Sequence, residues 1–258
     1  MLSETMNNQF SLNGKRILVT GGTRGIGRAI SIRFARAGAS VIANYVRDVK
    51  SAESLKAEAD QESVSIDICR ADLTSGKGFD RLLDSIGRDE GRLSGMVHCA
   101  ATGVHGPIEE LTTRHFDWTF SLNVRAFFEL VKILLPKFSK GSSIVAISSK
   151  GAVRAVPSYA LIGASKGALE SLARNLAAEL APKGIRVNIL SPGSVLTDAW
   201  KVMPEREKRI SETLRKTPTG RLTTPEDVAW AAQFLCSDAS SAIVGHTLVV
   251  DGGAEITE

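Results

Sequence analysis

The sequence predicts an α/β fold: a single domain in which helices cover both faces of a doubly wound, seven-stranded parallel sheet. Two observations carry this prediction. Apolar runs of strand length alternate with segments of helical periodicity along nearly the whole chain, as in sheets built from βαβ units. The first run leads directly into a glycine-rich turn at residues 21–27, the usual junction between the first strand and first helix of such a fold.

The predicted elements alternate in order. Strands are expected at 15–20, 41–45, 64–69, 95–99, 143–148, 186–190 and 247–251. Helices are expected from the glycine turn to Gly38 and over 49–59, 78–86, 116–135, 159–181 and 225–236. The strand segments are nearly continuous apolar runs, which is typical of parallel strands buried on both faces.

One domain accounts for most of the chain. Its 258 residues, 43% hydrophobic and 23% charged, are enough for one large core. Residues 1–13 form a polar extension, and no repeat or linker divides residues 14–258. The stretch 194–220 is longer than ordinary loops, so we interpret it as a lid over a substrate; a surface excursion without function is the alternative.

Several classes of protein are disfavoured. The net charge of +4 comes without a Lys/Arg cluster, and no apolar run is long enough for a membrane span or a signal peptide. Cys69, Cys99 and Cys236 lie far apart and the four histidines are scattered, so neither a disulfide framework nor a metal site is expected. We therefore expect a cytoplasmic protein with no nucleic-acid or membrane partner.

The glycines of the first turn predict a dinucleotide site. Gly21, Gly25 and Gly27 lie where a strand turns into a helix. Without Cβ atoms, such a turn lets backbone N–H groups approach a pyrophosphate at the helix N-terminus. The spacing differs from the GxGxxG fingerprint, and a turn that uses glycine for geometry alone is the alternative.

The end of the second strand favours NADP(H) over NAD(H). Sites for NAD place an acidic residue there to bind the ribose 2′-hydroxyl, whereas this strand ends in Asn44 and Tyr45. Arg24 and Arg47 lie nearby in the sequence, and guanidinium groups match phosphate oxygens. Asp48 follows at once, so a solvated loop arginine is the alternative.

Six motifs occur along the chain: Thr20-Gly21-Gly22-Thr23-Arg24-Gly25-Ile26-Gly27, Ala71-Asp72-Leu73, Asn123 within a helix, Ile147-Ser148-Ser149, Ser165-Lys166 and Ser191-Pro192-Gly193. In this order, and over about residues 14–253, they resemble the short-chain dehydrogenase/reductase family, which has a Rossmann-type fold.

The resemblance implies roles for single residues. Asp72 would contact the adenine, Lys166 would bind the nicotinamide ribose, and Asn123 would hold a water of the proton relay. A capping aspartate, an exposed helix lysine and a satisfied core amide are the respective alternatives. The glycine turn and the resemblance together give an expected cofactor site of Gly21, Thr23, Arg24, Gly25, Ile26, Gly27, Arg47, Asp72, Leu73, Ala100, Lys166, Pro192, Gly193 and Thr197.

A shifted tyrosine indicates the subtype. Common members of the family carry Tyr-xxx-Lys, but this sequence has Ile162 at the tyrosine position. Tyr159, seven residues before Lys166, gives a Tyr-x6-Lys spacing that resembles the enoyl-acyl-carrier-protein reductases. On a helix this spacing puts the two side chains within roughly 20° of each other and about 10.5 Å apart along the axis.

A second departure follows the fourth strand. Residues 97–103 replace the usual Asn-Asn-Ala-Gly, and this region looks closest to the divergent NADPH-dependent enoyl reductases of some bacteria. Ser149 stands ten residues before Tyr159, where many other enoyl reductases have a second tyrosine. Its role stays open, and Ser149, Tyr159, Lys166 and Asn123 are the expected catalytic residues.

The predicted activity is NADPH-dependent reduction of trans-2-enoyl thioesters, with acyl carrier protein as the expected carrier, as in fatty-acid or polyketide biosynthesis. Tyr159 would donate a hydrogen bond to the thioester oxygen as negative charge develops there. The α-carbon proton would come from solvent or from the network of Tyr159, Lys166 and Asn123. Expected substrate contacts are Ala101, Thr102, Tyr159, Leu196, Trp200 and Met203.

Two other functions remain open. A 3-ketoacyl or other carbonyl reductase of the same family could use Ser149, which lies 13 residues before Ile162 as a ketoreductase serine lies before its tyrosine. A non-catalytic NADP-binding regulator could keep the fold without the chemistry. By resemblance, the helices over 107–135 and 159–181 would assemble a homotetramer.

Overall fold

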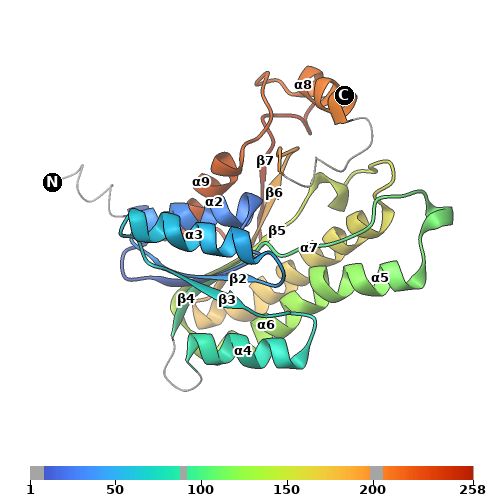
Figure 1. The fold of residues 1–258 in the computed structure, drawn as a ribbon. Helices are drawn as coiled ribbons and strands as arrows, with labels where there is room; N and C mark the ends of the chain where they lie inside the picture. The colour runs from blue at the N-terminus through green and yellow to red at the C-terminus, as the bar shows by residue number, and fades with distance from the viewer. Residues whose placement is uncertain (1–8, 88–91, 198–205, 258) are drawn as a thin grey trace.

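A computed structural model describes residues 9–87, 92–197 and 206–257. Within these ranges seven parallel strands form one sheet in the order β3-β2-β1-β4-β5-β6-β7 (Figure 1), and the predicted fold class is confirmed. The strands are β1 (Arg16–Thr20), β2 (Ser40–Tyr45), β3 (Ile66–Arg70), β4 (Leu93–His98), β5 (Phe138–Ile147), β6 (Arg186–Pro192) and β7 (Thr247–Val250).

The strand order reverses between β1 and β4. β1 pairs with β2 on one side and with β4 on the other, so the chain leaves β1 toward one edge and later returns to build the other half. In an open α/β sheet, ligands bind at the carboxyl ends of the strands beside such a reversal. The topology therefore directs attention to the ends of β1 and β4.

Helices cover both faces of the sheet (Figure 1). One face carries α2 (Gly25–Arg36), α3 (Val49–Gln61) and α9 (Pro225–Cys236), and the other carries α4 (Gly76–Ile86), α5 (Thr113–Phe120), α6 (Ala126–Leu134) and α7 (Ala160–Leu180). Each face encloses its own apolar cluster. Successive β1 residues alternate between them: Leu18 belongs to one cluster, Ile17 and Val19 to the other.

Two elements differ from their predicted form. The expected helix over 116–135 begins earlier, in α5, and a π-helical turn (Ser121–Arg125) separates α5 from α6. The stretch expected to be an irregular lid contains a helix, α8 (Arg206–Lys216). Its charged sequence has only a weak apolar stripe, and for that reason periodicity did not reveal it. In Figure 1, α8 stands apart from the sheet, close to the C-terminus.

The polar extension is partly anchored. Leu12 is fully buried, and the Gln233 side chain donates to the backbone carbonyl of Phe10. The last described residues of the extension thus pack on the domain. Among the described residues, no helix is both long and apolar enough to cross a lipid bilayer.

Helix α9 has a reciprocal N-terminal cap, and α9 packs along α2. The Thr224 hydroxyl accepts from the Asp227 N–H, while the Asp227 carboxylate accepts from the Thr224 N–H at 2.9 Å. Arg221 lowers the pKa of Asp227 by hydrogen bonding to its carboxylate. The cap is therefore ionised at neutral pH.

Replacing this cap is expected to destabilise the domain. Thr224→Ala removes the acceptor for the Asp227 N–H, so the free energy of unfolding should fall by about 1 kcal/mol, measured as a lower urea midpoint with an unchanged slope. Thr113→Ala, at an exposed position in the first turn of α5, is the matched control. Equal losses in the two variants would contradict the contribution of the cap.

Candidate active site

The glycine turn leaves the N-terminus of α2 open. Gly25 has a φ of +52°, and a Cβ on Gly27 would overlap the carbonyl oxygen of Gly21. Arg24 is the N-cap residue, but its side chain makes no capping hydrogen bond. The first N–H groups of α2 are thus available to an anion, and a pyrophosphate fits this cradle.

Predicted cofactor residues from two further segments meet at this turn. A Cβ at Gly21 would lie 3.1 Å from Ala100, after β4, and a Cβ at Gly25 would lie 3.4 Å from Thr197, after β6. Away from the turn, a Cβ at Gly193 would lie 2.7 Å from Asp251. Thr23 is buried and Ile26 packs on the core, so side chains of the turn itself anchor it to the domain.

Asp72 and Leu73 were both expected to contact the cofactor, but their side chains lie in different environments. The Asp72 carboxylate accepts from the N–H and hydroxyl of Thr74 at 2.9 and 2.7 Å and stays exposed, while Ser75, not Asp72, caps α4. Leu73 is only 1% exposed and belongs to the core. Its side chain therefore cannot face a cofactor; only its backbone can.

The Asp48 carboxylate is already hydrogen-bonded within the protein. Its carboxylate caps α3, accepting from the Ser51 N–H at 3.0 Å and the Ser51 hydroxyl at 2.7 Å. The backbone hydrogen bond from Ser51 is the main reason that the pKa of Asp48 is lowered. Arg24 and Arg47 are exposed beside it. This arrangement leaves no free carboxylate at the position that a ribose 2′-hydroxyl would require.

Tyr159 and Ser149 lie together at the end of β5. The two hydroxyl oxygens are 3.3 Å apart. Tyr159 stands immediately before α7, and Ser158 before it has a φ of +60°, a strained conformation for a side-chain-bearing residue. Burial raises the pKa of Tyr159, so the phenol is protonated at neutral pH and can donate.

The Tyr159 ring is enclosed by two neighbours. A Cβ at Gly151 would lie only 2.5 Å from the ring, so the absence of a side chain there makes room for it. The His105 ring packs at 5.3 Å between centroids. The Gly106 N–H donates to the Ser158 carbonyl at 3.1 Å, which ties the loop carrying His105 to the start of α7.

Lys166 points into the sheet from α7. Its side chain is buried, and Nζ donates to the Ile147 carbonyl at 2.7 Å. Burial lowers the pKa of Lys166 to about 8. A buried, hydrogen-bonded ammonium group at the end of β5 fits the role of holding a ribose, and its burial rules out the exposed-lysine alternative.

Asn123 lies in the π-helical turn, and its side-chain amide makes three hydrogen bonds. Oδ1 accepts from the Thr102 N–H at 2.8 Å, while Nδ2 donates to the Thr102 carbonyl and the Ser165 hydroxyl, each at 2.9 Å. The fully buried side chain thus holds the loop that carries Ala101 and Thr102. This geometry favours a positioning role, and π-helical turns often mark functional sites.

Ile162 occupies the tyrosine position of common family members. It is 7% exposed, and a Cβ at Gly103 would overlap its side chain. An apolar group therefore fills the space four residues before Lys166. No hydroxyl is available there to donate to a substrate oxygen.

Three polar residues escaped the sequence analysis. His98 is buried; Thr20 Oγ1 lies 3.1 Å from its Nδ1 and accepts from the N–H groups of Cys99 and Ala100. Glu170 accepts from the Ser148 hydroxyl at 2.6 Å, beside Ser149. The third is His105, whose ring packs on Tyr159 from a separate loop, so no sequence spacing relates the two; Glu170 lies on α7, the helix that follows Tyr159.

The predicted substrate residues are only partly described. Leu196 is 42% exposed, Ala101 is exposed and Thr102 is half-buried, and all three follow strands that end at the site. Pro192 is buried at the end of β6. Trp200 and Met203 lie outside the described residues.

Comparison with known proteins identifies the family. A family model described as "Enoyl-(Acyl carrier protein) reductase" matches residues 21–255. The chain belongs to the short-chain dehydrogenase/reductase family of oxidoreductases. One relative, a 1-cyclohexenylcarbonyl-CoA reductase from Streptomyces collinus, is 34% identical over 93% of this chain and 86% of its own length.

Two solved structures have nearly the same fold. A short-chain dehydrogenase from Burkholderia cenocepacia in complex with NADP has a TM-score of 0.87 at 31% identity, over 95% of this chain and 99% of its own. A 7α-hydroxysteroid dehydrogenase with NADH and 7-oxoglycochenodeoxycholic acid has a TM-score of 0.89 at 34% identity, over 95% and 96%. Both hold a nicotinamide cofactor.

Cofactor binding should depend on pH through Lys166. Because the pKa is lowered from 10.5 to about 8, the ammonium is present below about pH 8 and is lost above it. The affinity for NADPH should therefore fall as pH rises through about 8, measured by nucleotide fluorescence titration. Lys166→Met should bind more weakly with a flat profile; an equally flat wild-type profile would contradict this role.

Proposed function

We propose that the protein reduces the carbon–carbon double bond of trans-2-enoyl thioesters with NADPH, as an enoyl-acyl-carrier-protein reductase does. The observation that carries the proposal is the placement of the only phenol at the site. Tyr159 lies seven residues before a buried Lys166 and beside Ser149, while Ile162 fills the usual tyrosine position with an apolar side chain. The family model's description and the relative from Streptomyces collinus support the same reading.

NADP(H) is the proposed cofactor. The open N-terminus of α2 would hold the pyrophosphate. When bound, the reduced nicotinamide supplies a hydride to the β-carbon of the substrate. Lys166 would donate to the ribose from its position against the Ile147 carbonyl.

Tyr159 would stabilise the charge that develops on the substrate. As the β-carbon gains hydride, the thioester oxygen becomes negative, and a hydrogen bond to that oxygen strengthens in the transition state. The raised pKa of Tyr159 keeps its proton in place for this bond. Ser149 would hold the phenol oxygen in position at 3.3 Å.

A carbonyl reductase is the second candidate. The Ser149–Tyr159 pair offers two hydroxyls to one oxygen, and a ketone oxygen could accept from both while hydride reaches its carbon. The hydroxysteroid dehydrogenase with a bound 7-oxo compound is a family member of that kind. The apolar Ile162 favours the enoyl reaction, because no acid stands at the position where common members place theirs.

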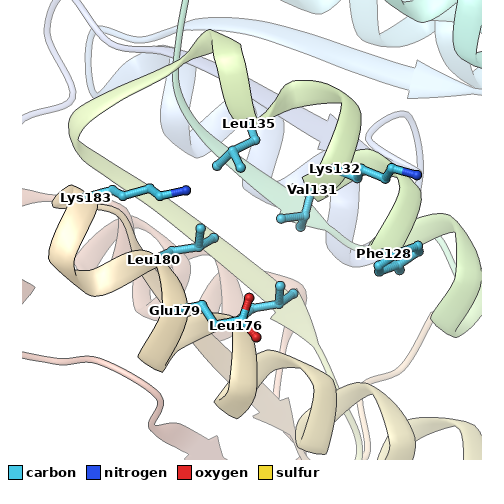
Figure 2. Close-up of a pocket in the computed structure, with 8 residues that line it drawn as sticks. All are labelled: Phe128, Val131, Lys132, Leu135, Leu176, Glu179, Leu180 and Lys183. Atoms are coloured by element: carbon cyan, nitrogen blue, oxygen red, sulfur yellow. The ribbon is translucent and has the colours of Figure 1, made fainter.

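We also propose acyl carrier protein as the substrate's bearer, a cytoplasmic location and a homotetramer. The three cysteines are free, which suits a reducing compartment. A groove of about 260 Å³ lies between α6 and α7. Figure 2 shows its apolar side chains, among them Val131, Leu176 and Leu180, between the two helices, with Phe128 at one end. A second copy of the chain would cover this apolar surface.

The activity test compares two substrates. Purified protein with NADPH should consume a trans-2-enoyl thioester such as crotonyl-CoA and leave acetoacetyl-CoA unchanged, followed as loss of cofactor absorbance. Turnover of the ketone alone would replace the enoyl proposal with carbonyl reduction. Cofactor binding without turnover of either thioester would favour the regulator.

Removing the phenol should separate catalysis from binding. Tyr159→Phe keeps the ring packed against Gly151 but cannot donate, so kcat should fall by about 10²- to 10³-fold. The dissociation constant for NADPH should stay within about twofold, because the phenol oxygen does not touch the cradle at α2. A Tyr159→Phe enzyme with wild-type kcat would exclude this role.

Assembly should depend on the α6–α7 groove. Phe128, 43% exposed, becomes charged in Phe128→Glu, and burying that carboxylate between copies would be costly. Light scattering after gel filtration should show the wild-type mass of four chains reduced in this variant. Val49→Glu, at a 37% exposed position on α3, outside the groove and outside both segments expected at the interface, serves as the control, and a monomeric wild type would refute the proposal.

A further inference from the structure

Arg70, at the end of β3, lies beside the loop that follows β2. It pairs in register with Tyr45, the last residue of β2. Its Nε donates to the Val46 carbonyl at 3.1 Å. The Asn44 amide donates to the carbonyls of Cys69 and Ala71 at 3.3 and 2.9 Å, so the ends of these two strands are held together and Arg70 is fixed against residues 46–48.

The glycine turn reaches the same place. The Gly22 N–H donates to the Asn44 carbonyl at 2.9 Å, which joins the turn to the end of β2. Arg24 follows two residues later, and its charge contributes to the lowered pKa of Asp48. Arg24, Arg47 and Arg70 therefore converge on one loop from three segments.

These three arginines differ from their neighbours in how their charge is balanced. Arg28 and Arg36, one and three turns further along α2, are paired with Glu58 and Glu62. Among the described residues, Arg24, Arg47 and Arg70 are exposed and form no ion pair. The adjacent carboxylate, Asp48, is held by Ser51 at the start of α3.

We propose that Arg70 is a specificity-determining residue that completes, with Arg24 and Arg47, a site for a phosphate monoester on the adenosine ribose. The inference rests on the proposed use of NADP(H) and adds to it a residue outside the glycine turn and the β2 loop. One guanidinium nitrogen holds the Val46 carbonyl, and the other two remain free to donate to phosphate oxygens. Arg70 thus contributes charge at a fixed position.

Ligand fragments can test this without any catalysis. Isothermal titration would compare adenosine 2′,5′-bisphosphate with ADP, since only the first carries a 2′-phosphate. In Arg70→Gln, affinity for the bisphosphate should fall by about 5- to 20-fold and affinity for ADP by less than about twofold. Arg70→Lys, which keeps the charge but not the fork, should lie between the two. Arg114→Gln, an exposed arginine on α5, should match wild type.

The outcomes separate this inference from the proposed cofactor. A wild-type protein that binds both fragments equally would refute the NADP(H) preference itself. A wild type that prefers the bisphosphate, with Arg70→Gln unchanged, would refute only the role of Arg70. Equal loss of both ligands in Arg70→Gln would also refute it, since that result means a collapsed loop, and equal losses in the Gln and Lys variants would exclude a contribution from charge.

Discussion

The contact between the Lys166 ammonium and the Ile147 carbonyl determines how the site is assembled. An ammonium group buried without a partner would be costly, so α7 can dock on the sheet only where this carbonyl, at the end of β5, meets it. Ser149 lies two residues after Ile147, and its hydroxyl accepts a hydrogen bond from Tyr159, the residue just before the same helix. One strand–helix contact therefore sets the positions of the ammonium group, the phenol and the serine hydroxyl together.

Regular periodicity made most of the fold predictable from sequence. Every expected strand is present with ends shifted by a few residues, and the predicted helix over 225–236 matches α9. The helix expected over 159–181 is present as α7, with Tyr159 at its N-cap and Lys166 in its second turn. Local rules suffice where a feature is contained within one element.

Features that depend on contacts between segments were not predictable. The π-helical turn changes the register around Asn123, but its sequence keeps an ordinary helical pattern. Leu73 was expected at the cofactor, yet its position after β3 directs the side chain into the core. Asp48 was ambiguous because a carboxylate next to an arginine can face a ligand or cap the following helix, and only the backbone of α3 decides between the two.

Gly103 and Gly151 constrain how the positions of Tyr159 and Ile162 could change during evolution. The side chain of Ile162 fills space that a Cβ at Gly103 would need, and the Tyr159 ring fills space that a Cβ at Gly151 would need. Each pair must therefore change jointly: a bulkier residue at either glycine displaces its partner, and a phenol moved to position 162 leaves unfilled volume at 159. Moving the phenol from position 159 to position 162 therefore takes at least two substitutions, and the loops that carry Gly103 and Gly151 must keep their glycines to accommodate large side chains at both positions.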